Sequence, residues 1–304
     1  MNLRDLQYIL ALAEHSHFGN AAAACNVSQP TLSGQVAKLE QELGVEIFHR
    51  VGRSIRPTEA GEQILEHARR AVSASNDIVD TARANRDPLS GRLRLGVVPT
   101  LGPYLMPFVL PVVADKLPNA PLVIVEDMTD NLVPLVAEGK LDAAIIATTP
   151  EPAELTSMEL FDEPFWVATP ANHPLLSLKT LRSQDIDPKS LLLLADGHCL
   201  RDQVIDLCGH PQVGSASKAD TRATSLEMLL HLTAAGHGVT LLPQLAVDSG
   251  RAANIQIAIR PLADEAGRRV RLVYRRNSPR LKALVELARL IRACLPDSVR
   301  KLQK

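Results

Sequence analysis

The chain has 304 residues, of which 46% are hydrophobic, and a formal net charge of −1 at pH 7. That length suffices for two or three domains, and the near-neutral charge excludes a global basic field that would attract nucleic acid. Four cysteines in so long a chain do not form a secreted disulfide framework. No apolar run reaches the ~18 residues of a membrane span, and Met1–Asp5 lacks signal-peptide character. We therefore expect a cytoplasmic protein with no membrane partner.

The first 58 residues carry the pattern of a winged helix-turn-helix. Apolar residues recur at helical spacing over the first thirteen positions, and the small residues 21–25 predict a second, closely packed helix. After a turn, Ser28 is a suitable N-cap for a third helix, which Gly44 ends. Residues 45–57 predict a β-hairpin wing, with three arginines and no acidic residue from position 47 to 58.

The outer face of the third helix and the wing are candidates for contact with double-stranded DNA, because this layout is typical of proteins that read the major groove. Residues 1–90 hold nine Lys or Arg and eleven Asp or Glu, and this balance of −2 favours the alternative of a plain helical bundle with a solvated face. Positions 47–58 of the wing alone carry a net charge of +3, from Arg50, Arg53 and Arg56. Thr31 and Gln35 suit base edges, and short polar side chains and Lys38 suit phosphates. The residues assigned to DNA are Ser28, Gln29, Pro30, Thr31, Ser33, Gln35, Lys38, Arg50 and Arg53.

Residues 59–87 predict one long linker helix. Its apolar and small residues alternate by four and three, as in a coiled-coil seam, at Ile64, Ala68, Ala71, Ser75, Ile78 and Ala82. A helix of this length spans about 43 Å and has no core of its own to rest on. We expect it to pair with the same helix of a second chain, the alternative being a helix that lies on its own domain.

Residues 88–304 alternate strand and helix patterns, which is typical of an α/β fold with doubly wound units. Asp87-Pro88-Leu89-Ser90-Gly91 breaks the preceding helix and marks the boundary. The predicted strands include 92–99, 122–126, 143–147, 165–169 and 191–195. Two such units hinged around a cleft would place a ligand at the carboxyl ends of the strands.

Two cysteines, Cys199 and Cys208, lie at the ends of a segment whose apolar residues have helical spacing. Their sulfurs would lie roughly 13 Å apart along such a helix, near opposite faces. A disulfide needs Cα atoms within roughly 7 Å, so the pair can join only if the helix unwinds. Cys199 would sit at the helix N-terminus, which favours a thiolate, with possible positive charge from His198 and Arg201. Asp202 could accept backbone N–H bonds in the first turn.

Other interpretations of these cysteines stay open. Both could be ordinary core residues, since cysteine is among the most buried residue types. Zinc binding by His198, Cys199, Cys208 and His210 is a weaker alternative, because the spacing exceeds the usual short one, and we expect no metal. Cys25 and Cys294 lie in predicted packed helices and are interpreted as structural.

Residues 1–60 resemble the DNA-binding domain of LysR-type transcriptional regulators. The matching stretches are Phe18-Gly19-Asn20-Ala21-Ala22-Ala23-Ala24, Val27-Ser28-Gln29-Pro30-Thr31-Leu32-Ser33 and Pro57-Thr58-Glu59-Ala60-Gly61. The rest is similar to that family's regulatory domain of periplasmic-binding-protein type. The resemblance implies a winged helix-turn-helix at 1–58, a dimerisation helix at 59–87 and a regulatory domain at 88–304, with subdomain I at about 88–163 and 268–304 and subdomain II at about 164–267.

Within that family, the run Gly197-His198-Cys199-Leu200-Arg201-Asp202-Gln203 with Cys208 resembles the peroxide-sensing members. The resemblance implies that hydrogen peroxide oxidises Cys199 to a sulfenic acid, that Cys208 resolves it as a disulfide, and that a tetramer rearranges to activate transcription with RNA polymerase. It implies no cofactor. The implied peroxide pocket comprises Thr100, Thr129, His198, Asp202 and Arg268, with Arg269 as the alternative to Arg268.

Thr100 and Thr129 each follow a predicted strand, where a hydroxyl can cap the next helix or face a cleft. Two rival functions follow from the same residues. A regulator of the same family could bind a small organic anion in the cleft, and a thiol peroxidase could use Cys199. We expect a regulator and not an enzyme, because nothing in residues 1–60 serves turnover.

Overall fold

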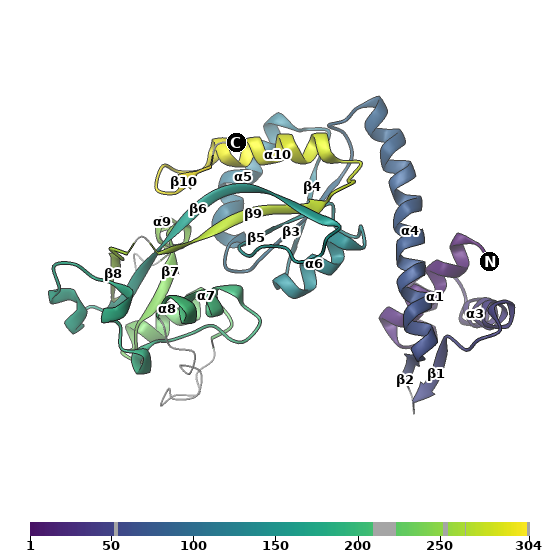
Figure 1. The fold of residues 1–304 in the computed structure, drawn as a ribbon, viewed down its shortest axis with the longest axis horizontal. Coiled ribbons are helices and arrows are strands. Elements are labelled where there is room, and N and C mark those ends of the chain that lie inside the picture. The colour runs from purple at the N-terminus through teal and green to yellow at the C-terminus, as the bar shows by residue number, and fades with distance from the viewer. Residues whose placement is uncertain (52–53, 209–222, 252–254, 265, 303–304) are drawn as a thin grey trace. The chain divides into compact units, whose positions relative to one another are not determined.

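The computed structural model describes residues 1–51, 54–208, 223–251, 255–264 and 266–302 (Figure 1). The chain forms two compact units, Met1–Ala82 and Arg83–Lys304. The predicted fold class is confirmed: a helix-turn-helix with a wing precedes a long helix and a mixed α/β unit. Among the described residues, no helix combines the length and the apolar character needed to cross a bilayer.

Local capping signals set the helices of the first unit. Its elements are α1 (Leu3–His15), α2 (Phe18–Ala24), α3 (Gln29–Leu43), β1 (Phe48–Val51), β2 (Ser54–Pro57) and α4 (Glu59–Arg86). The Ser28 side chain accepts a hydrogen bond from the backbone N–H of Thr31, and Gly44 ends α3 in a left-handed conformation. The second helix starts at Phe18, three residues before the predicted start, because His17 Nδ1 accepts from the Gly19 N–H at 3.0 Å.

Hydrogen bonds connect the wing to the start of α4. Its strands pair antiparallel, with Phe48 opposite Pro57. The Thr58 hydroxyl donates to the Glu46 carbonyl at 2.7 Å and accepts from the Gly61 N–H at 2.9 Å. A Cβ at Gly61 would lie 2.0 Å from the carbonyl oxygen of Ile47, so only glycine permits this approach.

The predicted seam on α4 is exposed along its second half. Leu65 and Ala68 are buried in the core of the first unit, whereas Ile78 is 72% exposed and Val79 57%. Apolar side chains of this size on a solvated helix are the expected features of a surface that pairs with another helix.

Three parallel strands begin the second unit. They are β3 (Leu93–Val97), β4 (Leu122–Glu126) and β5 (Ala143–Ile146), connected by α5 (Gly102–Lys116) and α6 (Thr129–Ala137). The sheet order is β10-β6-β9-β5-β3-β4, and β9 (Gly267–Arg275) pairs antiparallel with β5. The carboxyl ends of the parallel strands therefore meet at one edge, where ligands bind in such sheets.

Two long strands run side by side through the second unit, as Figure 1 shows; they connect the half that contains β3, β4 and β5 with the half that contains β7 (Thr240–Pro243) and β8 (Ile257–Pro261). One is β9 and the other is β6 (Leu155–Pro170), whose far half pairs antiparallel with β7 and β8. The remaining elements are 3₁₀ turns at Pro174–Ser177, Ser183–Asp185 and Pro188–Ser190, helices α7 (Cys199–Leu207), α8 (Leu226–Ala234), α9 (Gln244–Asp248) and α10 (Leu281–Cys294), and strand β10 (Arg300–Lys301).

One predicted strand is part of a longer strand, and another strand prediction was wrong. The strand predicted at 165–169 is the end of the 16-residue β6, whose first half alternates polar and apolar residues because one face is solvated. The strand predicted at 191–195 forms only isolated bridges, Leu191 with Val239 and Leu194 with Ala223. Apolar periodicity alone does not supply a partner along the whole length of a short run.

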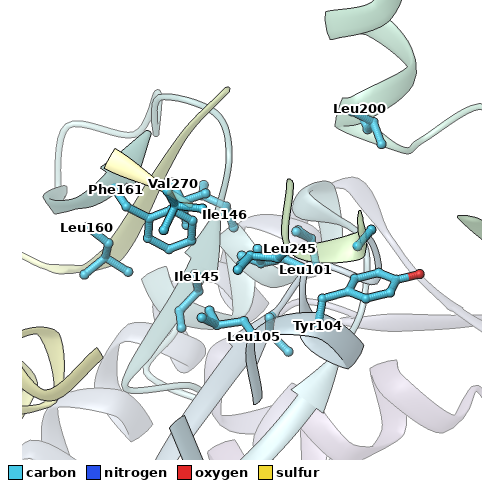
Figure 2. Close-up of a cluster of buried hydrophobic side chains, with 14 of the residues drawn as sticks. Leu101, Tyr104, Leu105, Ile145, Ile146, Leu160, Phe161, Leu200, Leu245 and Val270 are labelled. Atoms are coloured by element: carbon cyan, nitrogen blue, oxygen red, sulfur yellow. The ribbon is translucent and has the colours of Figure 1, made fainter. Parts of the chain in front are cut away.

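The core of the second unit joins its two halves. Figure 2 shows Ile145, Phe161 and Val270, which come from three adjacent strands, together with other members of the cluster. Leu200 of α7 belongs to the same cluster of buried residues. The helix that carries the cysteines is therefore anchored to the main core.

Candidate functional site

Cys199 is the first residue of α7 and is half-buried. His198 precedes it as N-cap in an extended conformation and makes no side-chain cap hydrogen bond. Gly197 has φ +92°, a conformation that glycine adopts without strain, and it turns the chain into the helix. Cys199 therefore lies in the first turn of the helix, where the backbone N–H groups carry partial positive charge.

Cys199 lines a narrow niche whose walls combine apolar residues with two hydroxyls and an imidazole. Its empty volume is about 160 Å³, and it is closed to a water-sized molecule. Its walls come from the turns after β3 and before α6 and from the start of α7; they are Val98, Pro99, Thr100, Met128, Thr129, Gly197, His198 and Cys199. The Thr129 hydroxyl and both ring nitrogens of His198 are buried and find no hydrogen-bond partner among the described residues. Such groups favour a small ligand that both donates and accepts hydrogen bonds.

The predicted positive charge beside Cys199 does not come from His198 or Arg201. Burial lowers the pKa of His198 below its usual value, so its ring is neutral at pH 7. The Arg201 guanidinium instead binds the preceding loop, with Nε 3.1 Å from an Asp196 carboxylate oxygen and Nη1 donating to the Leu194 carbonyl at 3.0 Å. Its charge is thereby paired with an acidic residue.

Thr100 accepts hydrogen bonds from Arg268. It does not cap the next helix, although a cap was one of the two roles expected from the sequence. Arg268 Nη1 donates to the Thr100 hydroxyl at 2.8 Å, and Nη2 donates to the Thr100 carbonyl at 3.0 Å. Helix α5 begins at Gly102 without a side-chain cap. Arg269 is instead partly exposed and paired with Asp162 and Glu159. Arg268 is thus the arginine of the two that contacts a residue of the niche.

A buried ion pair fixes Arg268 in place. Its Nε donates to a Glu163 carboxylate oxygen at 2.8 Å, and neither side chain has any exposed surface. The other Glu163 oxygen accepts from the Leu245 N–H at 2.8 Å, at the start of α9. Glu163 was not among the predicted site residues, because no local pattern connects it with residues more than 80 positions away.

Cys199 also borders a larger outer cavity of about 520 Å³. Its described lining includes three carboxylates, Asp130, Glu151 and Asp202, and no Lys, Arg or His. Asp202 lies in the first turn of α7. Gln203, which sequence reasoning missed, anchors this turn by donating from Nε2 to the Ala147 carbonyl at 2.7 Å. The remaining lining residues are Thr129, Val133, Pro134, Thr148, Thr149, Pro150, Pro152 and Gly197.

Cys208 lies in apolar surroundings at the other end of α7. It is the C-cap, its backbone N–H donates to the Val204 carbonyl at 3.1 Å, and it is 6% exposed. Burial, with a smaller contribution from Asp264, raises the pKa of its thiol. All four cysteines are free thiols. The helix therefore separates a thiol in a polar niche from one in the core.

The other two cysteines have no comparable setting. Cys25 is the C-cap of α2, and Cys294 donates from Sγ to the Ile291 carbonyl at 3.3 Å. Burial raises the pKa of both thiols. The zinc alternative needs His210, which lies outside the described residues, and no group of three or more potential ligands is placed to hold a metal within the described ranges.

Helix α3 presents a polar face opposite its buried stripe. Leu32, Val36 and Leu39 pack into the core. The predicted DNA residues on the other side are exposed or half-buried, and the hydroxyls of Ser28 and Thr31 lie 2.7 Å apart; the residues are Ser28, Gln29, Pro30, Thr31, Ser33, Gln35 and Lys38. Arg50 lies in β1, Arg56 is exposed in β2, and Arg53 is outside the described residues.

Family models match both units. Residues 3–62 match the bacterial regulatory helix-turn-helix of the lysR family, and residues 86–295 match the LysR substrate binding domain. The chain belongs to the LysR family. It is 39% identical over 304 residues to the DNA-binding transcriptional dual regulator OxyR of Escherichia coli K12, covering all of this chain and 99% of the relative. It is 40% identical to the hydrogen peroxide-inducible genes activator of Dickeya chrysanthemi, covering 99% of this chain and 98% of the relative.

Solved structures agree with this assignment. Full-length OxyR of Pseudomonas aeruginosa with a cysteine-to-aspartate substitution is 41% identical, with a TM-score of 0.78, and the match covers 97% of this chain and 99% of that one. A peroxide-bound cysteine-to-serine variant of OxyR from Corynebacterium glutamicum is 34% identical, with a TM-score of 0.65, covering 96% and 92%. The LysR-family protein described here therefore groups with OxyR-like, peroxide-inducible activators.

Proposed function

We propose that this LysR-family protein is a DNA-binding transcription regulator that senses hydrogen peroxide through Cys199. The observation that carries the proposal is the placement of a free thiol at the start of α7, beside buried polar atoms without partners. The names of its relatives, and the peroxide-bound state of one similar structure, support the same ligand.

The first step is the oxidation of Cys199. The thiolate attacks one oxygen of hydrogen peroxide, the O–O bond breaks, and the leaving hydroxide combines with the proton that the thiol released, giving a sulfenic acid and water. A neutral His198 offers one donor and one acceptor, and the Thr129 hydroxyl offers both. These groups match the two O–H donors and the lone pairs of peroxide. Because the niche is closed to water, its walls must open slightly to admit the oxidant.

The second step joins the two ends of α7. The Cys208 sulfur attacks the sulfenic sulfur, an S–S bond forms, and the hydroxyl leaves as water with the thiol proton. Helix α7 rises by about 12 Å over the eight steps from Cys199 to Leu207, and Cys208 follows as its C-cap. The helix must therefore unwind before the two sulfurs can meet. Unwinding also removes Cys208 and the buried Leu200 and Val204 from their packing. The helix is thus the element with two alternative states.

The output is a change in DNA binding. We assign residues 1–58 to the DNA-binding domain, 59–87 to the dimerisation helix and 88–304 to the regulatory domain with its two subdomains. In this scheme α3 enters the major groove, the wing contacts the backbone, and the exposed seam of α4 pairs with a second copy. A tetramer that rearranges around refolded α7 segments would change half-site spacing and the contact with RNA polymerase.

The redox claim is tested by a stoichiometric peroxide pulse followed by peptide mass spectrometry. We expect a loss of two hydrogens that links the Cys199 and Cys208 peptides. Cys199→Ser abolishes this product while DNA binding survives, and Cys294→Ser serves as the matched control that keeps it. A cross-link that still forms in the Cys199→Ser protein, or no oxidation of Cys199 in the parent, contradicts the proposal.

Two alternative functions, an effector-responsive regulator and a thiol peroxidase, can be distinguished with the same protein samples. The outer cavity has a volume suited to small organic ligands, which favours an effector-responsive regulator, but its three carboxylates disfavour an organic anion. Effector binding would change DNA affinity with no covalent product. A thiol peroxidase would consume peroxide far beyond one equivalent in steady state.

The DNA claim is tested at Lys38, which is exposed on α3. Lys38→Ala is expected to weaken binding to all sequences and to reduce the slope of log affinity against log salt by about 1, because one phosphate contact is lost. Lys282→Ala, an exposed lysine of α10, is the control that leaves the slope unchanged. Equal slopes for the parent and Lys38→Ala would contradict the placement of α3 in the DNA interface.

A further inference from the structure

We infer that Asp130 and Glu151 determine the specificity of Cys199 by charge, admitting uncharged reagents and repelling anions. The inference rests on the proposed function, because it concerns which oxidants and thiols reach the sensor sulfur. Hydrogen peroxide is uncharged at neutral pH, whereas many cellular thiols and several peroxides are anions. A negatively charged entrance discriminates between these classes without contacting the peroxide itself.

The outer cavity is the route to the sulfur. Cys199 lines both the inner niche and the outer cavity, and the inner niche is closed to a water-sized molecule. A reagent from solvent therefore meets the outer walls first. Two of those walls carry Asp130, in the first turn of α6, and Glu151, in the segment after β5.

The charge of these walls is of one sign. Asp130, Glu151 and Asp202 are exposed carboxylates, and the described residues of the lining include no basic side chain to neutralise them. The outer cavity is thus unlike a binding site for an anionic effector, which would present arginine or lysine. The N-termini of α6 and α7 partly offset the charges of Asp130 and Asp202, which lie in the first turns of these helices, whereas Glu151 lies on neither helix.

The size of the effect follows from Coulomb's law. Taking a separation of roughly 8 Å in water for the calculation, three carboxylates slow a unit anion about tenfold and accelerate a unit cation about tenfold at low salt. Screening removes most of this effect when the Debye length falls to about 3 Å in 1 M salt. The consequence for function is a longer lifetime of the sulfenic acid against anionic thiols, which gives Cys208 time to reach it.

The test compares two thiol reagents of similar size and opposite charge on the reduced full-length protein. Trimethylammonioethyl and sulfonatoethyl methanethiosulfonate each form a mixed disulfide with a thiolate and release methanesulfinate. The rate at Cys199 is followed on its peptide by mass spectrometry and divided by the rate with free cysteine. We expect a cation-to-anion ratio of about one hundred at low salt, because the anion is slowed and the cation is accelerated, and the ratio falls towards one in 1 M KCl.

Substitutions assign the effect to its residues. The double variant Asp130→Asn, Glu151→Gln is expected to lower the ratio to about five, since one of three charges remains. Asp130→Glu keeps the charge and the ratio, and Asp115→Asn, an exposed residue at the far end of α5, is the remote control. The rate with hydrogen peroxide stays within twofold in all variants, because peroxide carries no charge.

A ratio near one in the parent protein, or a ratio that the double variant does not change, overturns the inference and leaves peroxide sensing intact. Failure of peroxide to oxidise Cys199 in the parent contradicts the proposed function, and this is measured separately from the charge ratio. The two failures are therefore distinguishable in one set of samples.

Discussion

The two ends of α7 present opposite environments to the same functional group. At its start, Cys199 is half-buried beside polar atoms that lack partners and beside a cavity with three carboxylates. At its end, Cys208 is 6% exposed within the apolar core, and burial raises the pKa of its thiol. One end is arranged for reaction with a small polar molecule, and the other is arranged to keep a thiol protonated.

This difference teaches that, in the proposed scheme, the resolving step must overcome the folded structure more than the first oxidation does. Leu200 and Val204 lie on the buried face between the two cysteines. Burying such side chains stabilises a fold by about 1.5 to 3 kcal/mol each relative to exposure. The helix is therefore held by packing that a disulfide would have to replace in the proposed scheme.

The largest expected effect is the loss of the disulfide in Cys208→Ser. Peroxide should still oxidise Cys199, because its niche is unchanged, and the sulfenic acid should accumulate as an adduct with dimedone. Mass spectrometry of the Cys199 peptide measures this, with Cys25→Ser as the control that still forms the intrachain link. An intrachain disulfide to any other cysteine in Cys208→Ser would show that the ends of α7 are not the exclusive pair.

The second effect tests the ion pair beneath the niche. Glu163→Gln leaves the Arg268 charge buried without its carboxylate, and removal of one partner from such a pair typically costs about 3 to 5 kcal/mol. Urea unfolding of the reduced protein measures this loss. Asp162→Asn, at the partly exposed pair with Arg269, should change the midpoint little. Comparable midpoints for both variants would mean that the buried pair contributes no more than the surface one.

A smaller effect is expected from Val204→Ala, in the middle of the buried face of α7. The substitution should destabilise the reduced protein by about 2 kcal/mol and speed disulfide formation after oxidation, because less packing opposes unwinding. Stopped-flow oxidation with excess peroxide separates the two steps. Asp206→Ala, an exposed position of the same helix, is the control. A slower second step in Val204→Ala would contradict the unwinding scheme.

The smallest effects are in the pH dependence of stability. The pKa of His198 is lowered by burial, so below its unfolded value of about 6.5 the unfolded chain binds a proton that the folded chain does not. Stability is then lost as pH falls from about 6.5, by at most about 1.4 kcal/mol per pH unit for one group. His198→Gln should flatten this acid limb in urea unfolding, whereas an unchanged limb would show that the ring is charged or solvated in the folded protein.

The pKa of Cys208 is shifted in the other direction and gives an alkaline limb. Its folded thiol keeps a proton above the unfolded value of about 8.5, so stability is lost as pH rises beyond that value. Cys208→Ala should reduce this loss, although Cys25 and Cys294 add smaller contributions of the same sign because burial also raises the pKa of their thiols.

Local features of this protein were predictable from its sequence. The Ser28 cap, the end of α3 at Gly44 and the position of Cys199 at the start of a helix each depend on hydrogen bonds between residues at most five apart. Such signals lie within one or two turns of chain, and they do not need the rest of the fold. The periodicity of α4 likewise indicated a long helix with one apolar stripe.

Only the tertiary structure decided what surrounds the Cys199 sulfur. Arg268 reaches Thr100 across 168 positions and Glu163 across 105, and the carboxylates of the outer cavity come from three separate segments. The path of β6 through both halves was also hidden, because its partners β7, β8 and β9 come much later in the chain. Burial of an ion pair and the pKa of a neutral histidine depend on which distant surfaces exclude water, and local chain chemistry does not determine that.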